Sequence, residues 1–171
     1  VVWNSSGYES VETLRRMEGL VQVYMPDYKY ADSALARRYS AAEDYPAAAA
    51  EAVREMFRQR GAYRLDAEGL MTSGVLIRHL ILPGQDENTR SVIDFIEREF
   101  RPGDVLFSLM SQYTPMPGLT RFPELTKRVD ARDNAALVAY MHRCGIADGY
   151  WQEVESATAD MIPDFDGTGV C

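Results

Sequence analysis

The chain has 171 residues, enough for one domain with a buried core, and 46% of them are hydrophobic, as in globular rather than disordered proteins. The formal net charge of -8 and the pI of about 4.8 argue against a surface for nucleic acids or anionic membranes, because both need clusters of lysine and arginine. The sequence shows no signal peptide and no apolar run of membrane length, and its two cysteines, Cys144 and Cys171, cannot form a disulfide framework. The expected location is therefore the reducing cytoplasm.

The hydrophobic pattern predicts alternating strands and helices. Residues 1–3 are expected to end a strand, and Ser10 to cap a short helix whose apolar positions are Val11, Leu14 and Met17. Further strands are expected at residues 21–26, 74–84, 104–111 and 150–154. Helices are expected at residues 33–40, 45–61, 89–100 and 132–145, with residues 63–73 a polar connection and 162–171 a loop.

The longest predicted helix, residues 45–61, has clear signals at both ends. Asp44 can cap it, Pro46 lies in its first turn and Gly61 ends it. Strands that alternate with helices indicate parallel strands joined by right-handed crossovers. The predicted fold is a single α/β domain over residues 1–171, either an open sheet or part of a β/α barrel, with its site at the carboxyl ends of the strands.

Polar side chains gather at the predicted strand ends: Asn4, Ser5 and Ser6 after the first strand, Asp27 and Lys29 after the second, Arg78 and His79 within the third, and Ser111, Gln112 and Tyr113 after the fourth. Amides and hydroxyls can bind adenine or ribose, and lysine or arginine can pair with a carboxylate. Asp27 and Lys29 fit either a binding site or a plain ion pair. Arg78 needs a partner within its apolar strand, either a ligand or a carboxylate on a helix.

The histidines and cysteines favour no metal site. His79 should face away from Arg78 and is expected to be packed or at the surface rather than catalytic. His142 is expected to face solvent, and the spacing of the two histidines and two cysteines matches no metal-ligand pattern. The sequence also contains no glycine-rich phosphate loop, nucleophile elbow or zincin motif.

Five segments in the same order, NSSGYES, YMPDYKYAD, VLIRHLILPG, LMSQYTP and IPDFDGTGV, closely resemble segments of the radical S-adenosylmethionine superfamily, in particular proteins similar to pyruvate formate-lyase-activating enzyme. The resemblance covers essentially the whole chain. It implies a partial (β/α) barrel of parallel strands with outer helices, corresponding to the carboxyl-terminal part of a (β/α)6 half-barrel.

The resemblance also implies that the chain is truncated. In this family a C-x-x-x-C-x-x-C loop follows the first strand and holds a [4Fe-4S] cluster, and a Gly-Gly-Glu turn after the second strand holds the amino group of S-adenosylmethionine. Neither motif occurs in the sequence, and VVWNSSGYES resembles the end of the third strand. Both motifs are therefore expected before Val1, and this chain is expected to hold no metal ligand and to be inactive alone.

Family roles carry over only to matching positions. The resemblance implies that S-adenosylmethionine is bound by Asn4, Ser5, Asp27, Lys29, Arg78, Gln112 and Tyr113. Lys29 would lie near the cofactor carboxylate, and Gln112 and Tyr113 near the adenosine. The implied reaction is reductive cleavage of S-adenosylmethionine to a 5′-deoxyadenosyl radical, which abstracts hydrogen from a substrate, with a glycyl-radical enzyme and an electron donor as partners.

Two other functions remain open from the residues alone. Lys29 at a barrel strand end could form a Schiff base, as in an aldolase, if it is buried. The chain could also be a non-catalytic α/β interaction module. Without the strands expected before Val1, the first strand of this chain would be unpaired and its apolar neighbours exposed, so an edge-mediated dimer is expected.

Overall fold

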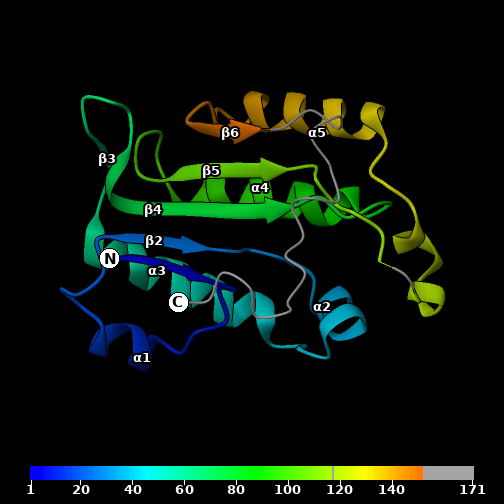
Figure 1. Cartoon of the computed structure of the whole chain (residues 1–171), viewed down its shortest axis with the longest axis horizontal. Coiled ribbons are helices and arrows are strands. Elements are labelled where there is room, and N and C mark those ends of the chain that lie inside the picture. The colour runs from blue at the N-terminus through cyan, green and yellow to red at the C-terminus, as the bar shows by residue number, and fades with distance from the viewer. Residues whose placement is uncertain (117, 152–171) are drawn as a thin grey trace, which may run out of the picture.

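The computed structural model describes residues 1–116 and 118–151, which form one sheet with helices packed against it (Figure 1). The strands are β1 (Val2–Ser5), β2 (Val23–Pro26), β3 (Arg64–Leu65), β4 (Met71–Leu80), β5 (Leu106–Met110) and β6 (Gly149–Trp151). The α-helices are α1 (Val11–Arg16), α2 (Ser33–Ser40), α3 (Tyr45–Arg60), α4 (Asp86–Glu99) and α5 (Ala131–Arg143). Two 3-10 turns, η1 (Leu119–Arg121) and η2 (Pro123–Thr126), precede α5.

The main strands are parallel, in the order β1-β2-β4-β5-β6, and β3 pairs with β4 antiparallel. The parallel pairing of β2, β4 and β5 confirms the α/β fold class with a parallel sheet. Because the strands run the same way, their carboxyl ends lie along one edge, on the right in Figure 1. The predicted site residues lie along that edge.

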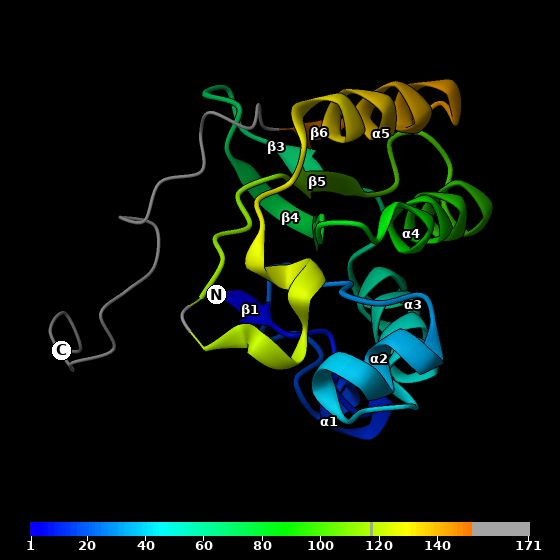
Figure 2. The same ribbon diagram turned by 90° about the vertical axis from the view of Figure 1, so that its right-hand side faces the viewer.

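The two faces of the sheet differ in burial. On β4, Val75, Ile77 and His79 are fully buried, whereas the alternate residues Leu76 and Arg78 are partly exposed. Helices α3 and α4 pack on the buried face, which Figure 2 shows on the right of the sheet. The opposite face is called the open face below.

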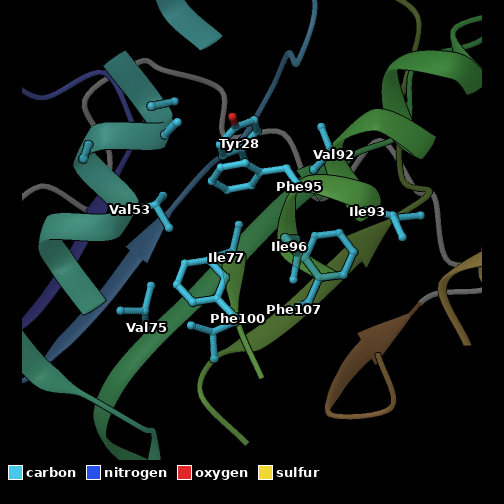
Figure 3. Close-up of a cluster of buried hydrophobic side chains, with 14 of the residues drawn as sticks. Tyr28, Val53, Val75, Ile77, Val92, Ile93, Phe95, Ile96, Phe100 and Phe107 are labelled. Atoms are coloured by element: carbon cyan, nitrogen blue, oxygen red, sulfur yellow. The ribbon is translucent and has the colours of Figure 1, made fainter. Parts of the chain in front are cut away.

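The core fills the space between the buried face and its helices. Figure 3 shows side chains of α4 meeting those of β4 and β5, with the rings of Tyr28 and Phe95 stacked at 4.7 Å. Val92, Ile93 and Ile96 share one face of α4 and are buried against the sheet, as in an amphipathic helix. Burial of these side chains is the main force that fixes the helices on the sheet.

The predicted polar connection at residues 63–73 is wrong, because it contains β3 and the start of β4. A tight turn joins the two strands, in which the Asp66 carboxylate accepts hydrogen bonds from the backbone N–H groups of Glu68 and Leu70. Gly74 has φ of 125°, and a Cβ atom there would lie 2.6 Å from the backbone of Tyr63. β4 ends at Leu80, so Pro83 lies beyond the strand.

Most helix predictions are confirmed, with shifts at the ends. Ser10 caps α1 by accepting from the N–H of Thr13, and α2 has the predicted bounds. Asp44 makes no side-chain cap on α3, because its carboxylate accepts instead from the hydroxyl of Tyr8. α4 begins at Asp86, three residues before the predicted start, and acidic residues fill its first turn. The predicted last strand is confirmed only at its start, because residues 152–154 and the 162–171 tail lie outside the described residues.

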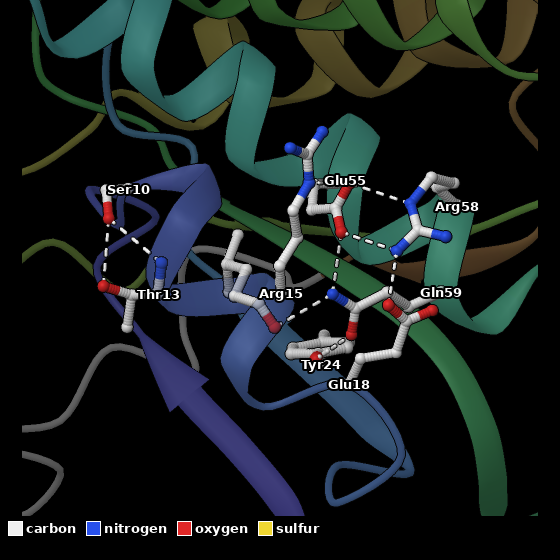
Figure 4. A network of polar contacts seen from close by, with 9 residues as sticks. Ser10, Thr13, Arg15, Glu18, Tyr24, Glu55, Arg58 and Gln59 are labelled. Carbon is white, nitrogen blue, oxygen red and sulfur yellow. Dashed lines mark hydrogen bonds and ion pairs between the residues drawn. The ribbon is translucent and has the colours of Figure 1, made fainter.

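A polar network fixes α1 on α3 (Figure 4). Glu55 is 5% exposed and accepts hydrogen bonds from Arg58 and Gln59. Gln59 also donates to the backbone carbonyl of Leu14 and accepts from the hydroxyl of Tyr24. The hydrogen bonds from Arg58 lower the pKa of Glu55 to about 2 despite its burial.

No helix in the described part of the chain has both the length and the apolar character needed to span a bilayer.

Candidate functional site

Three polar side chains from three adjacent strands meet at the carboxyl edge of the sheet. Arg78 Nη2 donates to Asn4 Oδ1 at 2.6 Å and lies 2.7 Å from Asp27 Oδ1. The backbone brings them together, because Asp27 forms a parallel bridge with Arg78 just after β2, and Ser5 of β1 pairs with Pro26. We call Asn4, Asp27 and Arg78 the strand-end cluster.

The partner of Arg78 is therefore a strand-end carboxylate. A carboxylate on a helix, the other possibility left by the sequence, is not the partner. Asp27 and Arg78 are 24% and 23% exposed, so the pair is shielded from water on the sheet side and accessible from the open face. This arrangement leaves part of the guanidinium available to an additional anionic or polar group.

Lys29 extends the cluster toward solvent. Its ammonium group lies 3.8 Å from Asp27 Oδ2, and its side chain is 45% exposed. Asp27 thus lies between two cations, Lys29 and Arg78. A Schiff-base lysine requires a buried amine, and Lys29 does not provide one.

A cavity of about 260 Å³ adjoins this cluster on the open face. It combines charged groups with an apolar wall and is lined by Asp27, Lys29, Tyr30, Leu80, Leu82 and Met110. A site of this composition suits a ligand that has a charged end and an apolar or aromatic part.

Buried polar groups hold the loop that follows β2. His79 is fully buried and lies 2.7 Å from the carbonyl oxygen of Tyr28 through Nδ1 and 2.9 Å from the hydroxyl of Thr89 through Nε2. Asn88 donates to the carbonyl of Lys29 and accepts from the N–H of Ala31. His79 is therefore packed, as expected, and burial lowers its pKa to about 4, so the ring is neutral.

The loop after β1 is joined to the loop after β2 by Tyr45 and Gly7. The Tyr45 hydroxyl lies within hydrogen-bonding distance of the carbonyls of Ser6 and Asp27 and accepts from the N–H of Lys29. A Cβ atom at Gly7 would lie 2.1 Å from the carbonyl oxygen of Asp27, and Gly7 has φ of 75°, so only glycine fits there.

Glu9 is a further carboxyl group near this edge. Burial raises its pKa, a hydrogen bond with Ser5 opposes the increase, and the charge of Asp27 adds to it. The sequence interpretation assigned no role to Glu9, because a glutamate in a polar loop looks like an ordinary surface residue.

The remaining predicted site residues have other contacts. Ser5 accepts from the N–H of Gly7, and the amide of Gln112 contacts the sulfur of Met110 at 3.8 Å. The hydroxyl of Tyr113 donates to the carbonyl of Leu125 in η2. Asn4, Asp27, Lys29 and Arg78 thus lie together, and the roles of Ser5, Gln112 and Tyr113 stay predictions.

Sequence reasoning also missed Tyr45 and Asn88 as residues that position the site. Both lie in the first turn of a helix, where they look like capping or core residues. The one available signal is that Asn88 and Thr89 continue the buried stripe of Val92, Ile93 and Ile96, where a polar residue needs a partner.

The described residues contain no group of three or more histidine, cysteine, aspartate and glutamate side chains that could hold a metal ion. Cys144 lies at the end of α5 and lines a separate cavity with Gly103 and Val105, which precede β5, so it is remote from the carboxyl edge. Cys144 is half-buried, and burial raises the pKa of its thiol.

No family model matches the chain. Over 130 residues it is 28% identical to an uncharacterized protein of Methanocaldococcus jannaschii, and the match covers 75% of the chain and 34% of that protein. The chain thus spans about a third of the length of this relative.

Proposed function

We propose that the chain forms half of the S-adenosylmethionine site of a radical S-adenosylmethionine enzyme, in the carboxyl-terminal part of a (β/α)6 half-barrel. The observation that carries this proposal is the strand-end cluster of Asn4, Asp27 and Arg78 beside a cavity at the carboxyl edge of a parallel sheet. The open face would be the inside of the partial barrel, where such enzymes bind their cofactor.

The charges and the cavity fit the two ends of this cofactor. The exposed ammonium of Lys29 would pair with the carboxylate of the methionine part, and Asp27 would hold Lys29 in place. Leu80, Leu82 and Met110 would form an apolar wall for the adenine ring. Arg78 would keep Asn4 and Asp27 in fixed positions across the three strands.

Beside a reduced [4Fe-4S] cluster, S-adenosylmethionine would supply radical chemistry that removes hydrogen from a substrate, and Asp27, Lys29 and Arg78 would hold it at the strand ends. The cluster needs three thiolates, and the sequence has two cysteines, so the cluster ligands would lie in polypeptide outside this chain. The proposed partners are an electron donor and a glycyl-radical enzyme, which would be the substrate.

Calorimetric titration with S-adenosylmethionine tests the proposal on the chain itself. Weak binding is expected, because the iron that would chelate the cofactor is not supplied. Replacing Lys29 by alanine should weaken binding by about 1–3 kcal/mol, the cost of losing a hydrogen bond to a charged group. Arg64→Ala is the control, because Arg64 is an exposed cation of β3 that pairs with the start of β4, at the opposite end of the sheet, and this variant should bind like the wild type. Equal affinity for the wild type and Lys29→Ala would show that Lys29 is only the ion-pair partner of Asp27.

A further inference from the structure

Four tyrosine rings form a continuous series along the carboxyl edge of the sheet. Their centroids are 5.6 Å apart for Tyr8 and Tyr45, 5.5 Å for Tyr45 and Tyr30, and 6.4 Å for Tyr30 and Tyr39. Each ring comes from a different segment. Tyr8 lies in the loop before α1 and Tyr30 in the loop after β2, whereas Tyr45 begins α3 and Tyr39 lies in α2. Contacts of this length between aromatic rings allow an electron to pass from one ring to the next.

The middle of the series borders the candidate site. Tyr30 lines the cavity beside Asp27 and Lys29, and it is 7% exposed. Its hydroxyl is hydrogen-bonded to Ser40 at 3.0 Å. Any strong oxidant bound in the cavity would therefore meet Tyr30 first among the four rings.

Both outer members have a carboxylate as proton acceptor. The hydroxyl of Tyr8, a residue that is 45% exposed, donates to Asp44. The hydroxyl of Tyr39 donates to Glu124 at 2.6 Å, and Arg38 pairs with the same carboxylate. Oxidation of a tyrosine at neutral pH requires its proton to leave, and a hydrogen-bonded carboxylate receives that proton directly. Packing alone requires ring contacts but no carboxylate at either end.

We propose that Tyr8, Tyr45, Tyr30 and Tyr39 conduct an oxidising equivalent from the cavity to the protein surface. A one-electron oxidant in the cavity takes an electron from Tyr30 and is reduced. Tyr39 then gives an electron to the oxidised Tyr30 and its own proton to Glu124, so Tyr30 is restored and the products are a neutral Tyr39 radical and a protonated Glu124. From Tyr30 the series also runs in the other direction, through Tyr45 to Tyr8, where Asp44 accepts the proton. A thiol reductant in solution then restores the outer tyrosine by giving a hydrogen atom and becomes a thiyl radical, and the carboxylic acid releases its proton to solvent.

The biological need for this path rests on the proposed function, because a carbon radical that escapes reaction with the substrate would be quenched to a C–H bond by an electron from Tyr30 and a proton from the solvent that reaches the cavity at Lys29. The conduction itself is a property of the four rings. It is testable without S-adenosylmethionine, so its failure and that of the proposed function are distinguishable.

The experiment places a photo-oxidant at the cavity of the full chain. Lys29→Cys, in a background with Cys144→Ser and Cys171→Ser, provides one attachment point for a ruthenium polypyridyl complex. A flash in the presence of an irreversible electron acceptor generates ruthenium(III), and transient absorption follows its reduction and the growth of tyrosyl radical. Circular dichroism verifies that each variant is folded.

Tyr30→Phe should slow the reduction of ruthenium(III) by at least about tenfold, which corresponds to about 1.4 kcal/mol in the barrier. The double variant Tyr8→Phe with Tyr39→Phe changes the two outer rings. It should leave the reduction of ruthenium(III) by Tyr30 intact and remove the long-lived tyrosyl radical. Tyr140→Phe is the control, because Tyr140 also donates to a carboxylate, Asp94 at 2.6 Å, but lies outside the series. Unchanged kinetics in Tyr30→Phe, or an unchanged long-lived radical in the double variant, would overturn the proposal.

Discussion

Arg78 and Asp27, which are 51 residues apart in the sequence, form an ion pair of 2.7 Å that joins β4 to the residue that follows β2. The same guanidinium donates to Asn4 at the end of β1, so one side chain connects three strands at the candidate site. Its position in the middle of an apolar strand is the reason that a partner could be expected from the sequence.

Replacing Arg78 by methionine should lower the free energy of unfolding by about 1 kcal/mol, because a hydrogen-bonded pair is lost but its groups are partly solvated. Arg132→Met, at an exposed position of α5, should change it by less than about 0.5 kcal/mol. Urea denaturation measures both values. If the two variants were equally stable, the cluster would have no role in holding the strand ends.

Replacing Glu55 by alanine should cost about 1–3 kcal/mol of stability, because Gln59 and Arg58 lose a buried acceptor. Glu51→Ala, at an exposed position on the same helix, is the matched control. The folded pKa of Glu55 is about 2, below the unfolded value, so its contribution is present above about pH 4.5 and is lost as pH falls toward 2. The stability difference between wild type and Glu55→Ala should therefore be constant near neutral pH and shrink in acid; a difference that grew in acid would contradict this.

His79 should make the fold less stable in mild acid. Its folded pKa of about 4 lies below the unfolded value of 6.5, so the unfolded chain takes up a proton first as pH falls. Stability from the neutral ring is complete above pH 6.5 and decreases by about 2–3 kcal/mol toward pH 4. Imidazole resonances in NMR spectra, assigned with His142→Gln, should show His79 unprotonated at about pH 5.5. A midpoint at the ordinary value would mean that the ring is not buried.

Much of the fold was predictable, because the signals for it are local. Ser10 caps α1 through its side chain as expected, and the segments predicted as helices at residues 33–40 and 89–100 form α2 and most of α4. The hairpin of β3 and β4 was missed. β3 has two residues, which is too short to show a hydrophobic period, and the turn after it begins at Asp66.

The candidate site was predictable in part. The rule for strand ends placed Asn4, Asp27, Lys29 and Arg78 at one edge, but their contacts depend on register between strands, which one sequence does not reveal. Asn88 and Tyr45 hold the loop after β2 by hydrogen bonds to Ala31 and Lys29, which are 57 and 16 residues away in the sequence. Such distant pairings leave no periodic signal. The hydrogen bond between Asp44 and Tyr8, which replaces the expected cap of α3, also joins residues far apart in the sequence and could not be predicted.

The most direct measurement of the proposed function is an NMR titration of the isotope-labelled chain with S-adenosylmethionine, which detects weak binding and locates it. Amide resonances of Asn4, Asp27, Lys29, Tyr30 and Leu82 should shift in proportion to one saturating binding curve, and those near Cys144 should not. Absence of shifts at millimolar cofactor, or shifts confined to residues away from the strand-end cluster, would contradict the assignment of this edge as a cofactor site.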